Sequence, residues 1–425
     1  MNEEKKRKKL YIATQDYPYG ATAERVFVES ELQALSEVFD VTIFSHARLK
    51  NKSVRTEVPS GVKVIDIPAN MDLPLKDKLK YGLKFFFEKD SYREIGSIIK
   101  SRTQFFKRLY ESVGFYILAM KDYECIREYI EDEEGIYYSF WYFYFCYSMT
   151  HNRDKYPKLK VVTRTHGHEL YEERYIGGRQ PFKLIMDEKL DKVIFAAEYA
   201  RDYYTSHYEK EASDKYELSR LGVLKEDISD ASAKEASENE KTYDLSLVSC
   251  SSLIELKRVD MIIAALSHIT DKQIKWVHFG DGPLMEKLKD QAALFLKGNV
   301  EYTFMGAVDN SKIHEYYLNN TPDCFITTSS TEGGCPVSIQ EAYAYGIPVI
   351  GTANGGITEM IDESGILLSE NPGADETAAA IRKLSELSDT EKNSLRMQAM
   401  NLWQLNYNAK TNSEHMIKIL ESLLV

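Results

Sequence analysis

Two kinds of hydrophobic spacing alternate along most of the chain. Short runs rich in β-branched and aromatic residues predict strands, and segments with apolar residues every three or four positions predict amphipathic helices between them. Strands that alternate with helices in this way form a parallel sheet in an α/β fold. The predicted strands are residues 9–14, 40–45, 61–68, 158–166 and 192–198 in the first half, and residues 245–250, 274–280, 300–306, 323–329 and 348–353 in the second.

A polar, acidic segment without hydrophobic periodicity separates the two series of elements. Residues 223–243 are rich in Ser, Ala, Asp and Glu and predict an interdomain linker. A chain of 425 residues is too long for one ordinary core, so we expect two Rossmann-like domains, at residues 1–222 and 244–404. Residues 405–425 predict an amphipathic helix that packs back on the first domain. Because open parallel sheets bind ligands beyond the carboxyl ends of their strands, we expect the sheets to face a shared cleft.

The net charge of −12 is carried by the second half of the chain, whereas one segment of the first half is basic. Residues 76–108, within a helical insertion expected at about residues 70–130, hold ten Lys and Arg against four Asp and Glu, with five Phe among them. This segment is either an ordinary solvated helical face or a peripheral contact with the inner membrane surface. The overall acidity argues against a nucleic acid partner.

The cysteines and the hydrophobic runs bear on the location of the protein. Five Cys without a Cys-x-x-Cys pair are typical of reduced thiols, so we expect a cytoplasmic protein, with a place at the inner face of the plasma membrane as the second option. The basic start of the chain lacks the apolar segment of a signal peptide. The longest uncharged run, residues 135–150, is shorter than the ~20 residues that span a bilayer, so no transmembrane helix is expected.

The segment 327–361 is the richest candidate for ligand binding. It follows a predicted strand, holds a Gly-Gly-Cys-Pro turn and leads into a helix, whose first N–H groups suit an anion such as a diphosphate. The residues of this anion site are Gly334, Cys335, Pro336, Val337 and Ser338. Glu332 and Glu341 frame the turn, and a carboxylate accepts two hydrogen bonds from neighbouring sugar hydroxyls. On these residues alone, a plain helix start with solvated acids stays open as the alternative.

The run EAYAYGIPVIGTANGGITE, residues 341–359, resembles the donor-binding signature of the retaining GT-B glycosyltransferases of family 4. The resemblance implies a GT-B fold and metal-independent transfer of a hexose from a nucleoside diphosphate sugar, UDP before GDP. It also implies a glycan or lipid-linked acceptor of the kind used for capsule or exopolysaccharide. In such enzymes the first Glu of the signature contacts the donor sugar and the second the ribose, roles that fall to Glu332 and Glu341. Eight residues separate these two glutamates, where seven are usual.

Two further runs of the second half resemble the same family. LVSCSSLIELKRVDMIIAAL resembles the strand and helix that hold the donor diphosphate, which makes Lys257 the diphosphate cation. Ser252 stands where the family has Arg, and Arg258 lies next to Lys257 as a second basic residue. HFGDGPLMEKL resembles the turn against the nucleotide base, which implies base contacts from Gly280, Gly282 and Pro283.

The first half carries two more resemblances. YPYGATAERVFVESELQAL resembles the first loop and helix of transferases that act on bacterial surface polysaccharides, so Gly20 and Ala21 are expected to approach the donor phosphate or the acceptor. TRTHGHELYEERY resembles the segment with the active-site histidine, which implies that His166 contacts the donor sugar. Glu169 stands where Asp is usual. His166, Lys257 and Glu332 are therefore the predicted catalytic residues.

The absent motifs limit the chemistry. No two Asp are separated by a single residue, so the metal-binding Asp-x-Asp of the other large glycosyltransferase fold is missing and no metal or cofactor beyond the sugar nucleotide is expected.

Two other functions stay open. Because of Ser252 and the longer glutamate spacing, the chain can also be a catalytically silent GT-B subunit that binds or chaperones a transferase complex. A nucleotide-sugar epimerase is a third possibility.

Overall fold

The computed structural model places most of the chain. It describes residues 7–20, 23–47, 55–68, 73–167, 169–172, 175, 177–225, 243–361 and 363–424. The chain forms two compact units. Unit 1 comprises residues 1–220 and 412–425, and unit 2 comprises residues 221–411. Most of the predicted linker, residues 226–242, lies outside the described residues.

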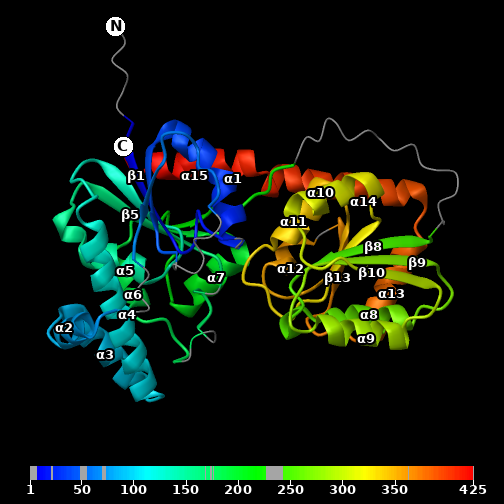
Figure 1. The fold of residues 1–425 in the computed structure, drawn as a ribbon, viewed down its shortest axis with the longest axis horizontal. Coiled ribbons are helices and arrows are strands. Elements are labelled where there is room, and N and C mark those ends of the chain that lie inside the picture. Colours follow the sequence, from blue (N-terminus) through cyan, green and yellow to red (C-terminus); the bar gives the residue numbers. More distant parts are fainter. Residues whose placement is uncertain are drawn as a thin grey trace, which may run out of the picture. The chain divides into compact units, whose positions relative to one another are not determined.

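Unit 1 is built on a parallel sheet of seven strands (Figure 1). The strands are β1 (Lys9–Thr14), β2 (Asp40–Ser45), β3 (Lys63–Asp66), β4 (Gly135–Ser139), β5 (Leu159–Thr165), β6 (Lys192–Phe195) and β7 (Tyr216–Leu218). Their order across the sheet is β3-β2-β1-β4-β5-β6-β7, so β1 and β4 lie side by side although more than a hundred residues separate them. The chain therefore reverses its winding at β1, the place where open α/β sheets bind ligands.

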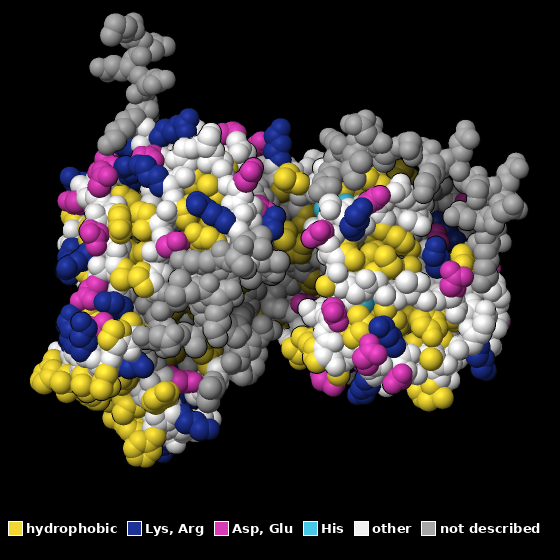
Figure 2. Space-filling view, viewed as in Figure 1, with side chains coloured by type: hydrophobic (Ala, Val, Ile, Leu, Met, Phe, Trp, Pro, Cys, Tyr) yellow, Lys and Arg dark blue, Asp and Glu magenta, His cyan; other side chains and the backbone are white. Residues whose placement is uncertain are grey.

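The helices of unit 1 pack on this sheet or extend from it. They are α1 (Ala23–Val38), α2 (Leu75–Phe85), α3 (Lys89–Ser101), α4 (Phe105–Ile126), α5 (Tyr144–His151), α6 (Lys183–Lys189), α7 (Glu198–His207) and α15 (Ala409–Glu421), which belongs to unit 1 from Asn412 onward. Met416 and Leu420 of α15 are buried in one cluster with Leu32 of α1 and Ile12 of β1. Over α2 and its neighbours, hydrophobic side chains gather on the surface of the unit (Figure 2).

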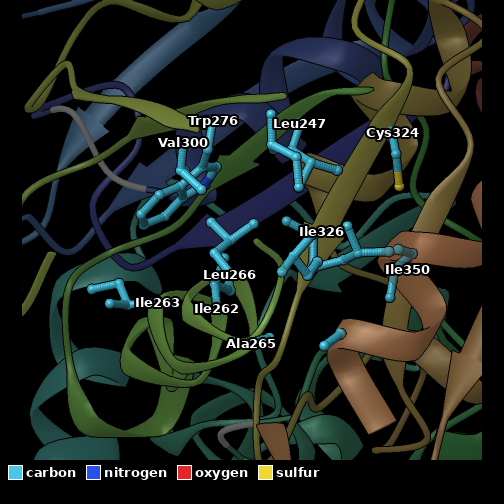
Figure 3. Close-up of a cluster of buried hydrophobic side chains, with 14 of the residues drawn as sticks. Leu247, Ile262, Ile263, Ala265, Leu266, Trp276, Val300, Cys324, Ile326 and Ile350 are labelled. Atoms are coloured by element: carbon cyan, nitrogen blue, oxygen red, sulfur yellow. The ribbon is translucent and has the colours of Figure 1, made fainter. Parts of the chain in front are cut away.

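Unit 2 has a parallel sheet of six strands in the order β10-β9-β8-β11-β12-β13. The strands are β8 (Leu245–Cys250), β9 (Ile274–Phe279), β10 (Val300–Phe304), β11 (Cys324–Thr327), β12 (Val349–Thr352) and β13 (Gly365–Leu368). The helices are α8 (Val259–Ser267), α9 (Met285–Phe295), α10 (Asn310–Asn320), α11 (Val337–Ala344), α12 (Ile357–Met360), α13 (Ala374–Ser385) and α14 (Asp389–Leu402). One core cluster joins Trp276 of β9 and Ile326 of β11 to Ile262 and Leu266 of α8 (Figure 3).

The predicted α/β class with two parallel sheets is confirmed, but the element predictions miss three strands. β4 lies in the aromatic run 135–150, β7 has three residues, and β13 follows the Gly-Gly pair of residues 355 and 356. All five residues of β4 are buried, so the run lacks the alternation of polar and apolar positions that marks a half-buried strand. Within the described residues, no helix is long and apolar enough to cross a membrane.

Candidate functional site

Lys257 lies where the first strand of unit 2 passes into its first helix. β8 ends at Cys250, a short 3-10 turn covers Glu255–Lys257, and Arg258 adopts a left-handed conformation with φ of 46° before α8 begins. The Lys257 ammonium forms an ion pair with the Glu332 carboxylate, and the side chains are 25% and 16% exposed. The structure thus brings together two predicted residues from the β8–α8 and β11–α11 loops.

Arg258 holds the β11–α11 loop rather than extending into solvent. Its Nε donates to the Thr328 carbonyl at 2.7 Å, and its second terminal nitrogen lies 3.4 Å from the Ser329 carbonyl and 3.3 Å from the Glu370 carbonyl. Burial lowers the pKa of Arg258 from its ordinary value. The Arg258 guanidinium thus binds backbone carbonyls, and Ser252 is exposed.

The predicted turn at Gly280, Gly282 and Pro283 lies directly against the β8–α8 loop. A Cβ on Gly280 would stand 2.0 Å from the Ser251 carbonyl oxygen, and a Cβ on Gly282 would stand 2.6 Å from that of Leu253. Both distances are too short for any side chain. The glycines therefore let two loops of neighbouring strands, β8 and β9, meet backbone to backbone.

His278, at the end of β9, supports the same loop and was not predicted. Its Nδ1 lies 2.8 Å from Ser249 Oγ, and its Nε2 lies 3.2 Å from the Ser251 carbonyl oxygen. Because the Ser251 carbonyl can only accept, Nε2 carries the ring proton and donates to it, and Nδ1 is assigned as the acceptor of the Ser249 hydroxyl proton. Ser249 Oγ also accepts a 2.9 Å hydrogen bond from Trp276 Nε1. Burial lowers the pKa of His278 to about 4, so the ring is neutral. Its place two residues before the Gly-Asp-Gly-Pro turn was the available signal.

A second glycine pair fixes the acidic loop. A Cβ on Gly355, whose φ is 57°, would stand 1.7 Å from the Glu332 carbonyl oxygen. A Cβ on Gly356 would stand 2.2 Å from the Gly334 carbonyl oxygen. Asn354 Nδ2 in turn donates to the Ser329 carbonyl at 3.0 Å. The residues between β12 and α12 thus pack directly against the loop from Glu332 to Gly334 and support it.

The helix predicted to begin near Val337 or Ser338 does begin there, as α11. Pro336 precedes it, and among the described residues no side chain caps this end. The N–H groups of Val337 and Ser338 therefore keep the anion-binding capacity of an open helix N-terminus. Cys335 turns its carbonyl toward Gln340, whose Nε2 donates to it at 3.0 Å.

Glu341 lies in the interior of unit 2, on α11. Its side chain is 5% exposed, and its Oε1 accepts a 2.7 Å hydrogen bond from Asn310 Nδ2. Nε2 of His314 lies 3.7 Å from the same oxygen. Burial, and then the Glu341 charge, raises the pKa of the Cys250 thiol to about 12. Asn310 and His314 of α10 were not predicted, because nothing in their sequence spacing relates them to α11.

In unit 1, His166 follows β5 and is held by Glu169. The backbone N–H of His166 donates to Glu169 Oε1 at 2.8 Å, and the ring Nδ1 lies 3.3 Å from the same oxygen. Burial alone would raise the pKa of Glu169, but the hydrogen bonds from His166 hold it below its usual value. The ring stacks on Phe140 with 4.8 Å between centroids, and its Nε2 has no hydrogen-bond partner among the described residues.

Glu24 and Trp141 complete this aromatic site and were not predicted. Trp141 packs 4.3 Å from the His166 ring, centroid to centroid, and its Nε1 donates to Glu24 at 2.5 Å. Glu24 also accepts the backbone N–H groups of Gln15 at 2.8 Å and Tyr17 at 2.7 Å. Burial raises the pKa of Glu24 despite these bonds.

The loop that Glu24 holds leads to the predicted Gly20. Gly20 has φ of 73°, in the left-handed region that favours glycine. Ala21, its predicted neighbour, lies outside the described residues. No group of three or more His, Cys, Asp or Glu side chains in the described ranges is arranged to hold a metal ion.

Comparison with known proteins finds a family model that matches part of the chain. Residues 230–399 match the model of the glycosyl transferases group 1. The phosphatidylinositol N-acetylglucosaminyltransferase of Arabidopsis thaliana has a subunit that is 27% identical over 183 residues, which are 42% of this chain and 40% of that relative. The match thus spans less than half of the length of the relative.

Solved structures share the fold over nearly the whole chain. Sucrose-phosphate synthase from Thermosynechococcus elongatus matches with a TM-score of 0.68 over 98% of this chain and 99% of its own, at 17% identity. HepE from Anabaena, solved in complex with UDP and glucose, matches with a TM-score of 0.63 over 98% of this chain and 100% of its own, at 15% identity. At these identities the likeness establishes the fold.

The fold is that of the GT-B glycosyltransferases, and the family model for part of unit 2 is likewise one of glycosyl transferases. The match to the glycosyl transferases group 1 covers residues 230–399, which is less than half of the chain. The predicted GT-B fold is confirmed. The match of residues 230–399 agrees with the predicted family and with a glycosyltransferase.

Proposed function

We propose that this chain moves a hexose or a related sugar from a nucleoside diphosphate donor to an acceptor, with retention of the anomeric configuration. A UDP-sugar is favoured over a GDP-sugar, because HepE, which shares the fold, binds UDP and glucose. The observation that carries the proposal is the pairing of Lys257 with Glu332 on the loop that leads to the open N-terminus of α11. A cation and uncapped N–H groups suit a diphosphate, and a carboxylate suits sugar hydroxyls.

Each predicted residue has a role in this proposal. Lys257 leaves Glu332 to neutralise the donor diphosphate, and Glu332 then accepts hydrogen bonds from the donor sugar. Glu341 accepts from the ribose hydroxyls, and His166 contacts the sugar from unit 1. The remaining predicted contacts are Gly20, Ala21, Ser252, Arg258, Gly280, Gly282, Pro283, Gly334, Cys335, Pro336, Val337 and Ser338.

The proposed reaction needs no nucleophile from the enzyme. The acceptor hydroxyl attacks the anomeric carbon on the face from which the diphosphate leaves. The bond from that carbon to the diphosphate oxygen breaks, the new glycosidic bond forms, and the departing oxygen takes the hydroxyl proton. Catalysis then rests on positioning and on charge neutralisation at the diphosphate, for which Lys257 is the main cation.

The proposed acceptor is a glycan or a lipid-linked sugar in cell-surface polysaccharide synthesis, such as that of a capsule or exopolysaccharide. The name of the Arabidopsis relative, a phosphatidylinositol N-acetylglucosaminyltransferase subunit, supports a lipid-linked acceptor. The proposed place is the cytoplasmic side, at the inner face of the plasma membrane, where such acceptors meet sugar nucleotides.

Thermal stabilisation by UDP, GDP, ADP and CDP tests the donor site. A nucleotide at ~100 times its dissociation constant stabilises the chain by about 2.7 kcal/mol, and Lys257→Ala and Glu341→Gln are expected to lose that stabilisation. Lys287→Ala, an exposed lysine on α9, is the matched control and keeps it. If none of the four nucleotides raises the melting temperature, the proposed donor site is wrong.

A catalytically silent subunit is the second candidate function. It is favoured by Ser252 in place of a cation and by the commitment of the Arg258 guanidinium to backbone carbonyls. The relative from Arabidopsis is likewise named as a subunit. Release of UDP from a panel of UDP-sugars, with and without lipid-linked acceptors, separates the two. Binding of UDP without any turnover would favour the silent subunit, and a changed sugar on intact UDP would indicate an epimerase.

A further inference from the structure

α2 presents apolar side chains on two opposite faces. Tyr81 and Phe85 point inward and are buried against unit 1. Leu75, Leu79 and Leu83, one helical turn apart, are instead 71%, 58% and 65% exposed. At 100° per residue these three leucines form a stripe on the side of the helix opposite to the buried pair. An ordinary surface helix would carry polar residues there.

The start of α4 extends this apolar stripe. Phe106 and Tyr110, also one turn apart, are 83% and 82% exposed. Between the two helices runs a shallow, mostly apolar groove of about 390 Å³. Its apolar lining comes from Leu79 and Leu83 of α2, from Phe86 directly after α2, and from Phe106, Leu109, Tyr110 and Val113 of α4. Figure 2 shows the hydrophobic side chains of this region gathered on the surface of unit 1.

Lysines border the apolar stripe. Lys76 and Lys78 flank Leu75 and Leu79 on either side of the stripe, and Lys107 follows Phe106. All three are exposed, and none has a carboxylate partner among the described residues. The lysines and the exposed apolar residues of α2 and α4 together form a surface that we name the basic apolar face.

An anionic bilayer fits the basic apolar face better than a second copy of it does. Apolar side chains that alternate with lysines are typical of segments that lie in the headgroup region of a bilayer. There the apolar side chains reach the boundary of the acyl chains, and the ammonium groups bind lipid phosphates. Two copies joined through this face would bring the basic segments 76–108, each with a net charge of +6, against one another. That repulsion opposes a symmetric dimer.

We propose that the basic apolar face docks unit 1 on an anionic membrane surface. Leu79, Leu83 and Phe106 enter the headgroup region, and Lys76 and Lys107 bind the lipid phosphates. Docking requires no sugar nucleotide. Vesicle binding therefore tests this proposal independently of the proposed transfer reaction, and either can fail while the other holds.

Sedimentation of the full chain with vesicles tests the docking. We expect binding to vesicles of phosphatidylcholine with about a third phosphatidylglycerol, weak binding to pure phosphatidylcholine, and weakening by salt. The triple variant Lys76→Glu, Lys78→Glu, Lys107→Glu should lose at least about tenfold in affinity, because each lysine near such a surface contributes about fivefold. The matched control reverses three exposed lysines of unit 2, Lys287→Glu, Lys297→Glu and Lys383→Glu, and keeps the affinity.

The apolar contribution needs its own pair of variants. Leu83→Ser with Phe106→Ser should lower binding to the same vesicles at least fivefold, whereas Leu294→Ser with Phe295→Ser, an exposed pair on α9, should not. Unchanged circular dichroism spectra would show that the variants fold. Equal vesicle binding by the two triple lysine variants would overturn the proposal. A dimer of the natural chain in solution that becomes monomeric in the double variant Leu83→Ser with Phe106→Ser would also overturn it.

Discussion

At the scale of single residues, glycines decide whether the loops of the proposed donor site can meet. Gly356 is the clearest case. Its backbone conformation is one that residues with a side chain can adopt, but a Cβ would lie 2.2 Å from the Gly334 carbonyl oxygen. We expect Gly356→Ala to cost about 1–3 kcal/mol through overpacking and to displace the loop of Glu332. Nucleotide binding, measured by calorimetry, should weaken with it.

Gly298→Ala is the matched control for this substitution. No heavy atom lies within 4 Å of the position of the new Cβ at Gly298, so stability and nucleotide binding should stay as they are. If Gly356→Ala binds nucleotide as tightly as the control, the loop of Glu332 is not part of the donor site.

His278 gives unit 2 a pH-dependent stability. Its pKa is lowered from the ordinary value of 6.5 to about 4 in the folded state, so the unfolded chain binds the proton first. The contribution of the neutral His278 ring to the free energy of unfolding is therefore fully present above about pH 6.5. It decreases by up to about 3 kcal/mol as the pH falls toward 4. Urea unfolding followed by circular dichroism between these pH values measures it.

The variant His278→Gln isolates this effect from other titrating groups. It should unfold more easily than the natural chain at neutral pH, and the gap between the two should narrow as the pH falls. A constant difference between the two chains across this pH range would show that the ring titrates normally and is not held neutral.

At the scale of elements, the sequence predicts which segments form the candidate site, but it does not predict the contacts between their side chains. Lys257 and Glu332 each follow a predicted strand, and the parallel sheet brings both loops to one edge. Their ion pair depends on the lengths of both loops and on the packing of Gly355 and Gly356 against the loop of Glu332. No local sequence pattern encodes these features. Glu24 was missed for a related reason. It is one of many acids on an amphipathic helix, and only the fold shows that it turns inward.

Glu24 is expected to hold the β1–α1 loop through backbone N–H groups. In Glu24→Gln, the side-chain NH2 would face donors, so at least one buried N–H would lose its acceptor, at about 1–3 kcal/mol. Urea unfolding should show this loss. Glu29→Gln on the same helix removes only a partly exposed pair with Arg25 and should cost less than about 1 kcal/mol. Equal costs for both variants would contradict the inward role of Glu24.

At the scale of the whole molecule, the sequence predicts two α/β units and their order, because hydrophobic periodicity is a local property. It does not predict that β4 is the neighbour of β1, since pairing across more than a hundred residues leaves no periodic signal. The last helix is a different case, because the sequence predicts that residues 405–425 form a helix that packs on the first domain. In the structure, this helix leaves unit 2 after Thr411 and belongs to unit 1.

α15 is therefore expected to stabilise a unit that was completed some 190 residues earlier in the chain. Met416 and Leu420 are fully buried against α1 and β1, so Met416→Ala should destabilise unit 1 by about 2–5 kcal/mol through the cavity it leaves. Hydrogen exchange read by mass spectrometry should show faster exchange in β1 and α1, with β8 and α8 unchanged. Met397→Ala on α14, whose side chain is 62% exposed, is the control and should leave both units as they are. Faster exchange in unit 2 alone would mean that α15 stabilises unit 2 instead.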